Sequence, residues 1–214
     1  MSGVKIRKSQ ILQPFGVGAI IEAEGRSYVV KPTTSWKTED MYDISIGSLA
    51  GRIPSIQKIL TPKDGERDGK TIFQLPVKRF PRWYFCSNNN CRKMYRLRDK
   101  DPDCCTESKC KKKQLIAMRW IMICEDGHMW DIPWQDYCHR NNLEKVTTPG
   151  PCDSTNLKFK TERGGDFDQM RIVCSDCKAE NTLDFIKDDK PKCHGYHAWS
   201  FHQSNCEKRL KIQP

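Results

Sequence analysis

Twelve cysteines, all in the second part of the chain, constrain this sequence more than any other feature. None precedes Cys86, and they recur in short groups with polar neighbours. In a cytosolic setting thiols stay reduced, so a cysteine-dense region indicates metal binding rather than a disulfide framework. We therefore expect the chain to divide at about residue 78, with a cysteine-free part before that point and a metal-stabilised part after it.

Charge and composition narrow the class of protein further. The 214 residues include 37 Lys and Arg against 27 Asp and Glu, a formal net charge of +10, and only 37% are hydrophobic. The chain is too polar for a large apolar core, yet it has too many aromatic residues for a disordered tail. No apolar run approaches a membrane span, and no apolar signal-peptide region follows Lys5, Arg7 and Lys8. We predict a cytoplasmic protein that does not enter a membrane.

The expected fold class is α+β: a small, β-rich assembly of zinc ribbons with an N-terminal β-hairpin and helical segment. Two β-rich runs flank Glu24-Gly25, which predicts the hairpin. Residues 40–60 predict one or two short helices that bury Ile44, Ile46, Leu49 and Ile53. Four parts are expected: a cysteine-free β/α segment (1–78), a first zinc ribbon with a basic stretch (79–123), a Cys/His segment with a short helix (124–156) and a C-terminal zinc ribbon (157–214).

The first candidate metal site combines two pairs of cysteines with the same spacing. Four residues separate Cys86 from Cys91, and four separate Cys105 from Cys110. Two such knuckles at this distance are typical of a four-cysteine zinc ribbon, whose thiolates suit the borderline-soft Zn²⁺ ion. Cys104 competes with Cys105 for the third position, and only the repeated spacing favours Cys105.

The second candidate site lies near the C-terminus. Cys174 and Cys177 are two residues apart, and Cys193 follows at ribbon distance, which is a strong zinc signal. Cys206 is the expected fourth ligand. Three histidines lie close enough in sequence to replace it: His194, His197 and His202.

A third and weaker candidate combines Cys124, His128, His139 and Cys152. The alternative is that both histidines are hydrogen-bonded structural residues. His139 falls in an expected short helix with Asp131 as its N-cap and Pro133 near its first turn, and neighbouring Cys138 would point into the core. The sequence thus predicts two to three zinc ions per chain.

The zinc sites show no catalytic signature. A catalytic zinc keeps an open position beside a general base, and the deaminase pattern needs His-x-Glu with a later Pro-Cys-x2-Cys. Here Glu125 precedes His128, and Pro151-Cys152 lacks the second cysteine. His-Glu-x2-His is absent as well. Gly16 and Gly18 precede a strand-like run rather than a helix, which rejects a phosphate-binding loop. We expect no catalytic residues.

A basic stretch accompanies the first ribbon. Residues 92–119 hold ten Lys or Arg against four acids, with aromatic residues close by, and this combination fits nucleic-acid binding. The alternatives are a solvated face and a surface that docks an acidic protein. The candidate contacts are Arg92, Lys93, Arg96, Arg98, Lys111, Lys112 and Lys113.

Several short motifs along nearly the whole chain belong together. They are Ser9–Leu12, Phe15–Ala19, Arg79–Trp83, Cys124–His128, Asp131–Trp134 with His139, and Cys174–Cys177 with Cys193–Gly195 and Trp199. In this order they resemble the DrmB-like component of the bacterial DISARM anti-phage defence system. The resemblance implies a non-catalytic partner of a helicase in DNA-targeting defence. Family members are much longer, and this chain resembles only their N-terminal portion, which leaves a separately encoded C-terminal half or a standalone relative as explanations.

Three functions of different classes compete. The first is a zinc-ribbon adaptor that binds DNA and a helicase or other defence-system subunit. The second is a metal-dependent nuclease or other hydrolase, which the number of cysteine ligands argues against because it leaves no open metal position. The third is a purely protein–protein scaffold in a defence or repair complex. Salt-dependent DNA binding separates the first from the third.

Overall fold

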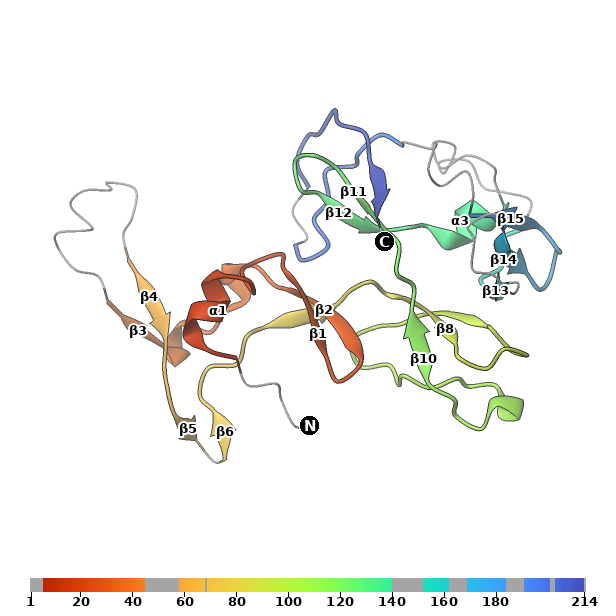
Figure 1. The fold of residues 1–214 in the computed structure, drawn as a ribbon. Helices are drawn as coiled ribbons and strands as arrows, with labels where there is room; N and C mark the ends of the chain where they lie inside the picture. The colour runs from red at the N-terminus through yellow and green to blue at the C-terminus, as the bar shows by residue number, and fades with distance from the viewer. Residues whose placement is uncertain are drawn as a thin grey trace.

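Figure 1 shows the fold of the chain, a computed structural model that describes residues 6–44, 58–67, 69–139, 152–161, 169–183, 191–200 and 203–213. Short antiparallel strands dominate these residues, in four three-stranded and two two-stranded sheets. The α-helices within them are α1 (Lys8–Leu12) and α3 (Trp134–His139), of five and six residues. Among the same residues, no helix has the length and apolar character needed to cross a membrane.

The predicted α+β class is wrong, because the described chain is mostly β-sheet with only short helices. Only two to four residues separate the cysteines within the pairs Cys86/Cys91, Cys105/Cys110 and Cys174/Cys177, whereas an isolated helix needs about 12–15 residues to be even marginally stable. A hairpin instead reverses the chain within a few residues and brings two side chains to one point. The β-rich part of the prediction agrees with the structure, and the cysteine clusters fit zinc-ribbon-like sites.

The predicted N-terminal hairpin is confirmed. β1 (Ile20–Ala23) pairs antiparallel with β2 (Arg26–Val30), and Ala23 lies opposite Arg26. Glu24 and Gly25 have φ of 53° and 72°, the positive values that a tight two-residue hairpin turn requires. β7 (Val77–Arg79) joins β2 as the third strand of this sheet.

Strands replace the ends of the helical segment predicted at residues 40–60. β3 (Met41–Asp43) pairs with β4 (Leu60–Pro62), and Ile44 is exposed rather than buried. The other predicted helix positions, Ile46, Leu49 and Ile53, lie outside the described residues. The described residues before position 80 also form the 3₁₀ turns η1 (Thr33–Ser35) and η2 (Thr38–Asp40) and the strand pair β5 (Glu66–Arg67) and β6 (Lys70–Thr71).

Three three-stranded sheets follow, here called the first, second and third ribbons. The first has the order β10-β8-β9, from β8 (Trp83–Cys86), β9 (Met94–Arg96) and β10 (Leu115–Ala117), with the 3₁₀ turn η3 (Ser108–Cys110). The second has the order β12-β11-β16, from β11 (Ile121–Ile123), β12 (Met129–Asp131) and β16 (Lys211–Gln213). The third has the order β13-β14-β15, from β13 (Leu157–Thr161), β14 (Met170–Cys174) and β15 (Glu180–Thr182).

The helix predicted to carry His139 is confirmed as α3, but Asp131 does not cap it. Asp131 ends β12, and its Oδ1 accepts a hydrogen bond from the backbone N–H of Arg82, with an N···O distance of 3.0 Å. The helix begins only at Trp134. Asp131 therefore ties the second ribbon to the first.

The largest cluster of buried side chains draws on all three ribbons and α3. Trp134 and Tyr137 on the helix are fully buried, and the Trp134 ring meets Trp120 edge-on with centroids 6.5 Å apart. The backbone N–H of Phe159 donates to the carbonyl of Arg92 at 2.9 Å, which fastens β13 beside the first ribbon. Because few residues are apolar, this shared core is small, and groups of cysteines lie around it.

Candidate metal centres

Three groups of four Cys or His residues converge in the structure, and together they contain all twelve predicted ligands. In each group the ligand atoms lie within 4.8 Å of one another. The groups, here called sites 1, 2 and 3, are Cys86, Cys91, Cys105 and Cys110; Cys124, His128, Cys193 and Cys206; and His139, Cys152, Cys174 and Cys177.

Site 1 lies at the end of the first ribbon and has the predicted composition. Cys86 and Cys91 flank the turn between β8 and β9, while Cys105 precedes η3 and Cys110 ends it. The Sγ atoms of Cys86 and Cys110 are 3.8 Å apart, as are those of Cys91 and Cys105. Hydrogen bonds from Asn88 to two of the sulfurs orient the first knuckle.

Of the two adjacent cysteines, the structure groups Cys105 with the other three thiols. Cys105 is buried and belongs to site 1, and its backbone N–H donates to the carbonyl of Lys113. Cys104 pairs with Gln114 in a β-bridge and is outside the group. Tyr95 adds a contact that the sequence did not suggest, because its hydroxyl lies 3.1 Å from Cys105 Sγ.

Site 2 lies beside the second ribbon and joins distant parts of the chain. Cys124 follows β11, and His128 precedes β12. The Sγ of Cys124 is 3.3 Å from Nδ1 of His128 and 3.9 Å from Sγ of Cys206. Nε2 of His128 is 2.7 Å from the hydroxyl of Ser204. When one ring nitrogen of a histidine binds a metal, a hydrogen bond from the other ring nitrogen holds the ring in one orientation.

Site 3 is formed by α3 and the third ribbon. Cys152 and Cys174 have Sγ atoms 4.0 Å apart. His139 ends α3, and its Nδ1 is 2.7 Å from the carbonyl oxygen of Gln135, so this nitrogen carries the proton and donates. Nε2 of His139 is buried without a hydrogen-bond partner among the described residues. A buried Nε2 that faces the other ligands and has no hydrogen-bond partner is suited to coordinate a metal ion.

The expected grouping of ligands into the second and third sites is wrong, because the structure combines two residues of each expected site with two residues of the other. Cys193 and Cys206 join Cys124 and His128, and the pair Cys174 and Cys177 joins His139 and Cys152. The cause is strand pairing. β16, which begins five residues after Cys206, pairs with β11, which ends directly before Cys124. The helix α3 packs against β14 and β15, which carries His139 to the third ribbon.

The distances within the sites fit tetrahedral zinc. For a Zn–S distance of about 2.3 Å, two ligands of a regular tetrahedron lie about 3.8 Å apart. The sulfur–sulfur distances of 3.8, 3.8, 3.9 and 4.0 Å in the three sites agree with this separation. These sulfur pairs are therefore spaced as two ligands of one metal ion would be, and each site could hold a metal ion.

The ionisation of the thiols also favours a cation. Burial raises the pKa of Cys86 and of Cys193 to about 12. Burial acts in the same direction on Cys174, but backbone hydrogen bonds from Cys177 and Asp176 outweigh it and lower the pKa of Cys174 to about 6. Several thiolates this close repel one another, and the positive charge of a bound divalent metal offsets that repulsion and keeps its thiol ligands deprotonated.

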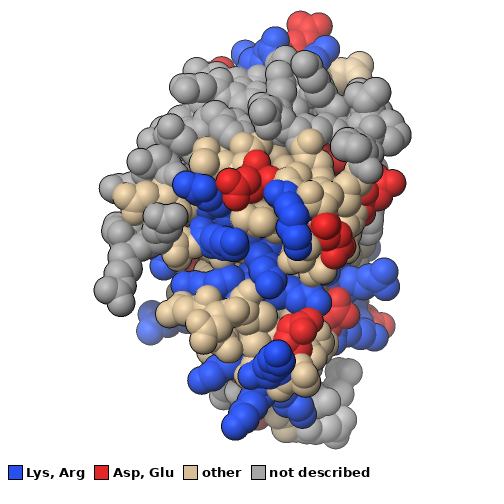
Figure 2. Space-filling view, turned by 90° about the vertical axis from the view of Figure 1, so that its right-hand side faces the viewer, with Lys and Arg blue, Asp and Glu red and all other residues tan. Residues whose placement is uncertain are grey.

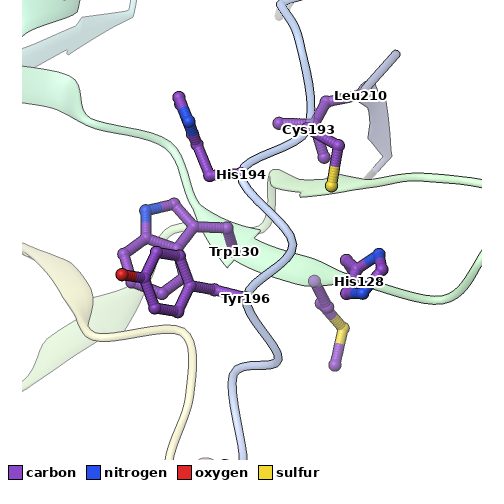
Figure 3. A pocket seen from close by; sticks show the side chains of 7 residues that line it. His128, Trp130, Cys193, His194, Tyr196 and Leu210 are labelled. Carbon is purple, nitrogen blue, oxygen red and sulfur yellow. The ribbon is translucent and has the colours of Figure 1, made fainter. Parts of the chain in front are cut away.

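Other residues considered as ligands lie elsewhere. Cys138 is buried in the main core, where its thiol is 3.4 Å from the carbonyl of Ala179, in agreement with the expected core role. The His197 ring lies 4.5 Å from that of His128 but is not a member of site 2. His194 is exposed, and His202 is outside the described residues. Figure 3 shows Cys193 and His128 beside one pocket, with the rings of Trp130 and Tyr196 close together at its other side.

The basic residues predicted to contact nucleic acid fall in different surroundings. The Arg92 guanidinium lies over the Phe85 ring, 5.2 Å from its centre, and Lys93 forms an ion pair with Glu107. The exposed Lys111, Lys112 and Lys113 form the turn after η3, and Arg96 and Arg98 are exposed near the end of β9. Figure 2 shows Lys and Arg gathered across one face, with Asp and Glu among them. Contact with nucleic acid stays a prediction.

Comparisons with known proteins cover almost the whole chain. Residues 7–214 match a family model described as "Domain of unknown function (DUF8724)". The chain is also similar to "DISARM protein DrmB" of Bacillus paralicheniformis, with 25% identity over 151 residues. That alignment covers 63% of this chain and 24% of the relative, so the chain spans about a quarter of the relative's length. The similarity noted from the motifs is thereby confirmed.

Proposed function

Because this chain belongs to the family described as "Domain of unknown function (DUF8724)" and is similar to DISARM protein DrmB, we propose that it is a component of a bacterial anti-phage defence complex. In this proposal it is a cytoplasmic, non-catalytic protein that holds three zinc ions. It acts as a DNA-binding adaptor and as the partner of a helicase or another defence subunit.

The observation that carries the zinc part is the geometry of the three sites. Each assembles four Cys or His ligand atoms within 4.8 Å, with neighbouring sulfur atoms 3.8 to 4.0 Å apart. Bound zinc would tie together strands too short to be stable alone, since the binding free energy of a structural zinc becomes folding free energy.

The same geometry supports a structural rather than a catalytic role. A catalytic zinc typically has three protein ligands and leaves its fourth position to water or substrate. Sites 1, 2 and 3 each offer four protein ligands. The chain's own residues would therefore fill the coordination sphere and leave no position for a reacting water molecule.

The charge of the zinc-loaded chain supports contact with nucleic acid. With Zn²⁺ bound, site 1 carries four thiolates and a net charge of −2, and sites 2 and 3 carry three thiolates each and a net charge of −1. These contributions lower the formal charge of the chain from +10 to +6. The protein thus remains basic and is suited to neutralise phosphates.

Zinc analysis and DNA binding test the proposal together. Protein purified under reducing conditions should contain three zinc ions per chain. The logarithm of its DNA affinity should fall linearly with the logarithm of the salt concentration. Changing Lys111, Lys112 and Lys113 together to Glu should weaken binding to all sequences alike, and should flatten the salt dependence by about 0.9 per lost phosphate contact on duplex DNA.

The matched control changes three lysines of the N-terminal segment to Glu, namely Lys37, Lys58 and Lys63. It alters the total charge equally and should leave DNA affinity closer to that of the parent. Zinc-free protein would overturn the metal part. A folded triple variant of Lys111–Lys113 that binds DNA normally but no longer copurifies a partner would show a protein-docking face, and the role would become that of a scaffold.

A further inference from the structure

A basic hollow lies between the first and second ribbons, outside the three metal sites. Its cationic lining residues are Lys78, Arg79 and Arg82, which lie close together in the sequence, and Arg96. Trp130, Asp131 and Ala198 complete the lining together with Phe80. Only Arg96 among these residues was predicted to contact nucleic acid.

The charges in the hollow leave a net positive surface. Arg79 is buried and already neutralised, because its guanidinium lies 2.8 Å from a carboxylate oxygen of Asp103. Lys78, Arg82 and Arg96 remain, opposed within the lining by the carboxylate of Asp131, which leaves a net charge of +2. Arg96 is exposed and makes no ion pair with any residue in the described part of the chain. Its guanidinium fork remains available to bind a phosphate through two hydrogen bonds.

The other cations are held in place by the fold. Lys78 Nζ donates to the carbonyl of Ala198 at 3.0 Å, and Arg82 Nε donates to the carbonyl of Leu97 at 3.2 Å. The backbone N–H of Arg82 is bonded to Asp131 on the facing ribbon. Side chains fixed in this way lose little conformational entropy when an anion binds.

An exposed aromatic ring borders the hollow. Trp130 on β12 is 38% exposed although it is one of the largest apolar side chains. Its ring lies 5.2 Å from the Tyr196 ring at an interplanar angle of 36°, so Tyr196 supports one side of it (Figure 3). Trp130 lines both this hollow and the pocket beside site 2. A supported, exposed indole next to an arginine is the arrangement on which an unpaired base stacks.

We propose that this hollow binds one nucleotide unit of a single-stranded nucleic acid. The phosphate contacts Arg96 and Arg82, and the neighbouring base stacks on Trp130. The strand must be single, because a base inside a duplex already stacks on its neighbours and cannot reach a side-chain ring. The inference rests on the proposed nucleic-acid-binding function and assigns it a substrate class and a place.

Fluorescence anisotropy with a labelled oligo(dT) 12-mer, and with a labelled 12-base-pair duplex, tests the proposal on the zinc-loaded chain. Trp130→Ala should weaken single-strand binding by about tenfold or more, as expected for one stacked base, and should leave duplex binding unchanged. Arg96→Glu should weaken single-strand binding and lower the slope of log affinity against log salt by about 0.7.

Two matched controls separate the hollow from general effects. Arg119→Glu makes the same charge change at another exposed position, and Tyr42→Ala removes another exposed aromatic ring. Both should bind the 12-mer nearly as the parent does. Zinc content and far-ultraviolet circular dichroism should be the same for all four variants, so that altered binding reports the hollow and not unfolding.

The outcomes distinguish this inference from the function on which it rests. Parental single-strand affinity in Trp130→Ala, or equal losses in Arg96→Glu and Arg119→Glu, would overturn the inference while leaving DNA binding in place. Absence of binding to either oligonucleotide would overturn both. Equal affinity for free thymidine monophosphate and for the 12-mer would show that the hollow binds a mononucleotide. That result would also refute the proposal that its ligand is a single-stranded nucleic acid.

Discussion

Replacing Cys206 by serine distinguishes the grouping seen in the structure from a grouping by proximity in the sequence. In the structure Cys206 Sγ is 3.9 Å from Cys124 Sγ, across 82 positions of the chain, and both belong to site 2. Proximity would instead place Cys206 with Cys174 and Cys177. The two arrangements differ in which site loses zinc affinity and in which ribbon loses its stability.

The size of the effect follows from the number of ligands. Structural zinc binds small domains with about 10–16 kcal/mol, so one ligand of four contributes on the order of 3–4 kcal/mol if the ligands share equally. That loss corresponds to a zinc affinity about a hundredfold to a thousandfold weaker. The damage should centre on β11, β12 and β16, because Cys206 and Cys124 each lie close in sequence to a strand of this sheet.

Zinc content under competition and hydrogen exchange provide the assay. After dialysis against a chelator that leaves the parent with three zinc ions, Cys206→Ser should retain two. Exchange followed by mass spectrometry should show lost protection in the peptides of β11, β12 and β16, and parental protection in β14 and β15.

Two cysteines outside the metal sites provide the controls. Cys104→Ser and Cys138→Ser should keep all three zinc ions, because neither thiol belongs to a site. The reasoning fails if Cys206→Ser loses protection in the third ribbon and keeps it in the second. It also fails if this variant retains three zinc ions with the parental affinity.

Three further changes test other parts of the structure. Gly195→Ala should weaken site 2 and lower its zinc affinity in chelator competition, because Gly195 has φ of 69° and an added Cβ would lie 1.6 Å from the backbone oxygen of Ser204. Trp134→Ala, which empties a fully buried position in the main core, should lower the free energy of unfolding by about 3–5 kcal/mol in urea titrations. Burial raises the pKa of Asp131 to about 6 against the opposing effect of Arg82 and other cations, so the folded protein holds this proton more tightly than the unfolded chain does and loses stability as pH rises from about 4 to 6. Asp131→Asn removes that cost, and its gain over the parent, at most about 3 kcal/mol, should be larger at pH 7.5 than at pH 5 in the same titrations.

Local features of the sequence determined the residues that can bind metal and the pairs in which they act. Cys86 with Cys91, Cys105 with Cys110, and Cys174 with Cys177 each lie a few positions apart, and one tight turn brings both thiols of a pair together. The Glu24-Gly25 hairpin was predictable for the same reason, because two residues with positive φ close a turn whatever the rest of the chain does.

Tertiary structure alone decided how these pairs combine and what lies between the ribbons. Any of several distant cysteines or histidines could complete a ligand set with Cys124 and His128, because their side chains are chemically equivalent as ligands. The choice of Cys193 and Cys206 follows from the pairing of β16 with β11. The basic hollow likewise joins Arg82, Arg96 and Trp130 only because two ribbons pack side by side. Residue spacing carries information about a single turn, whereas strand pairing and burial depend on the energies of the whole assembled chain.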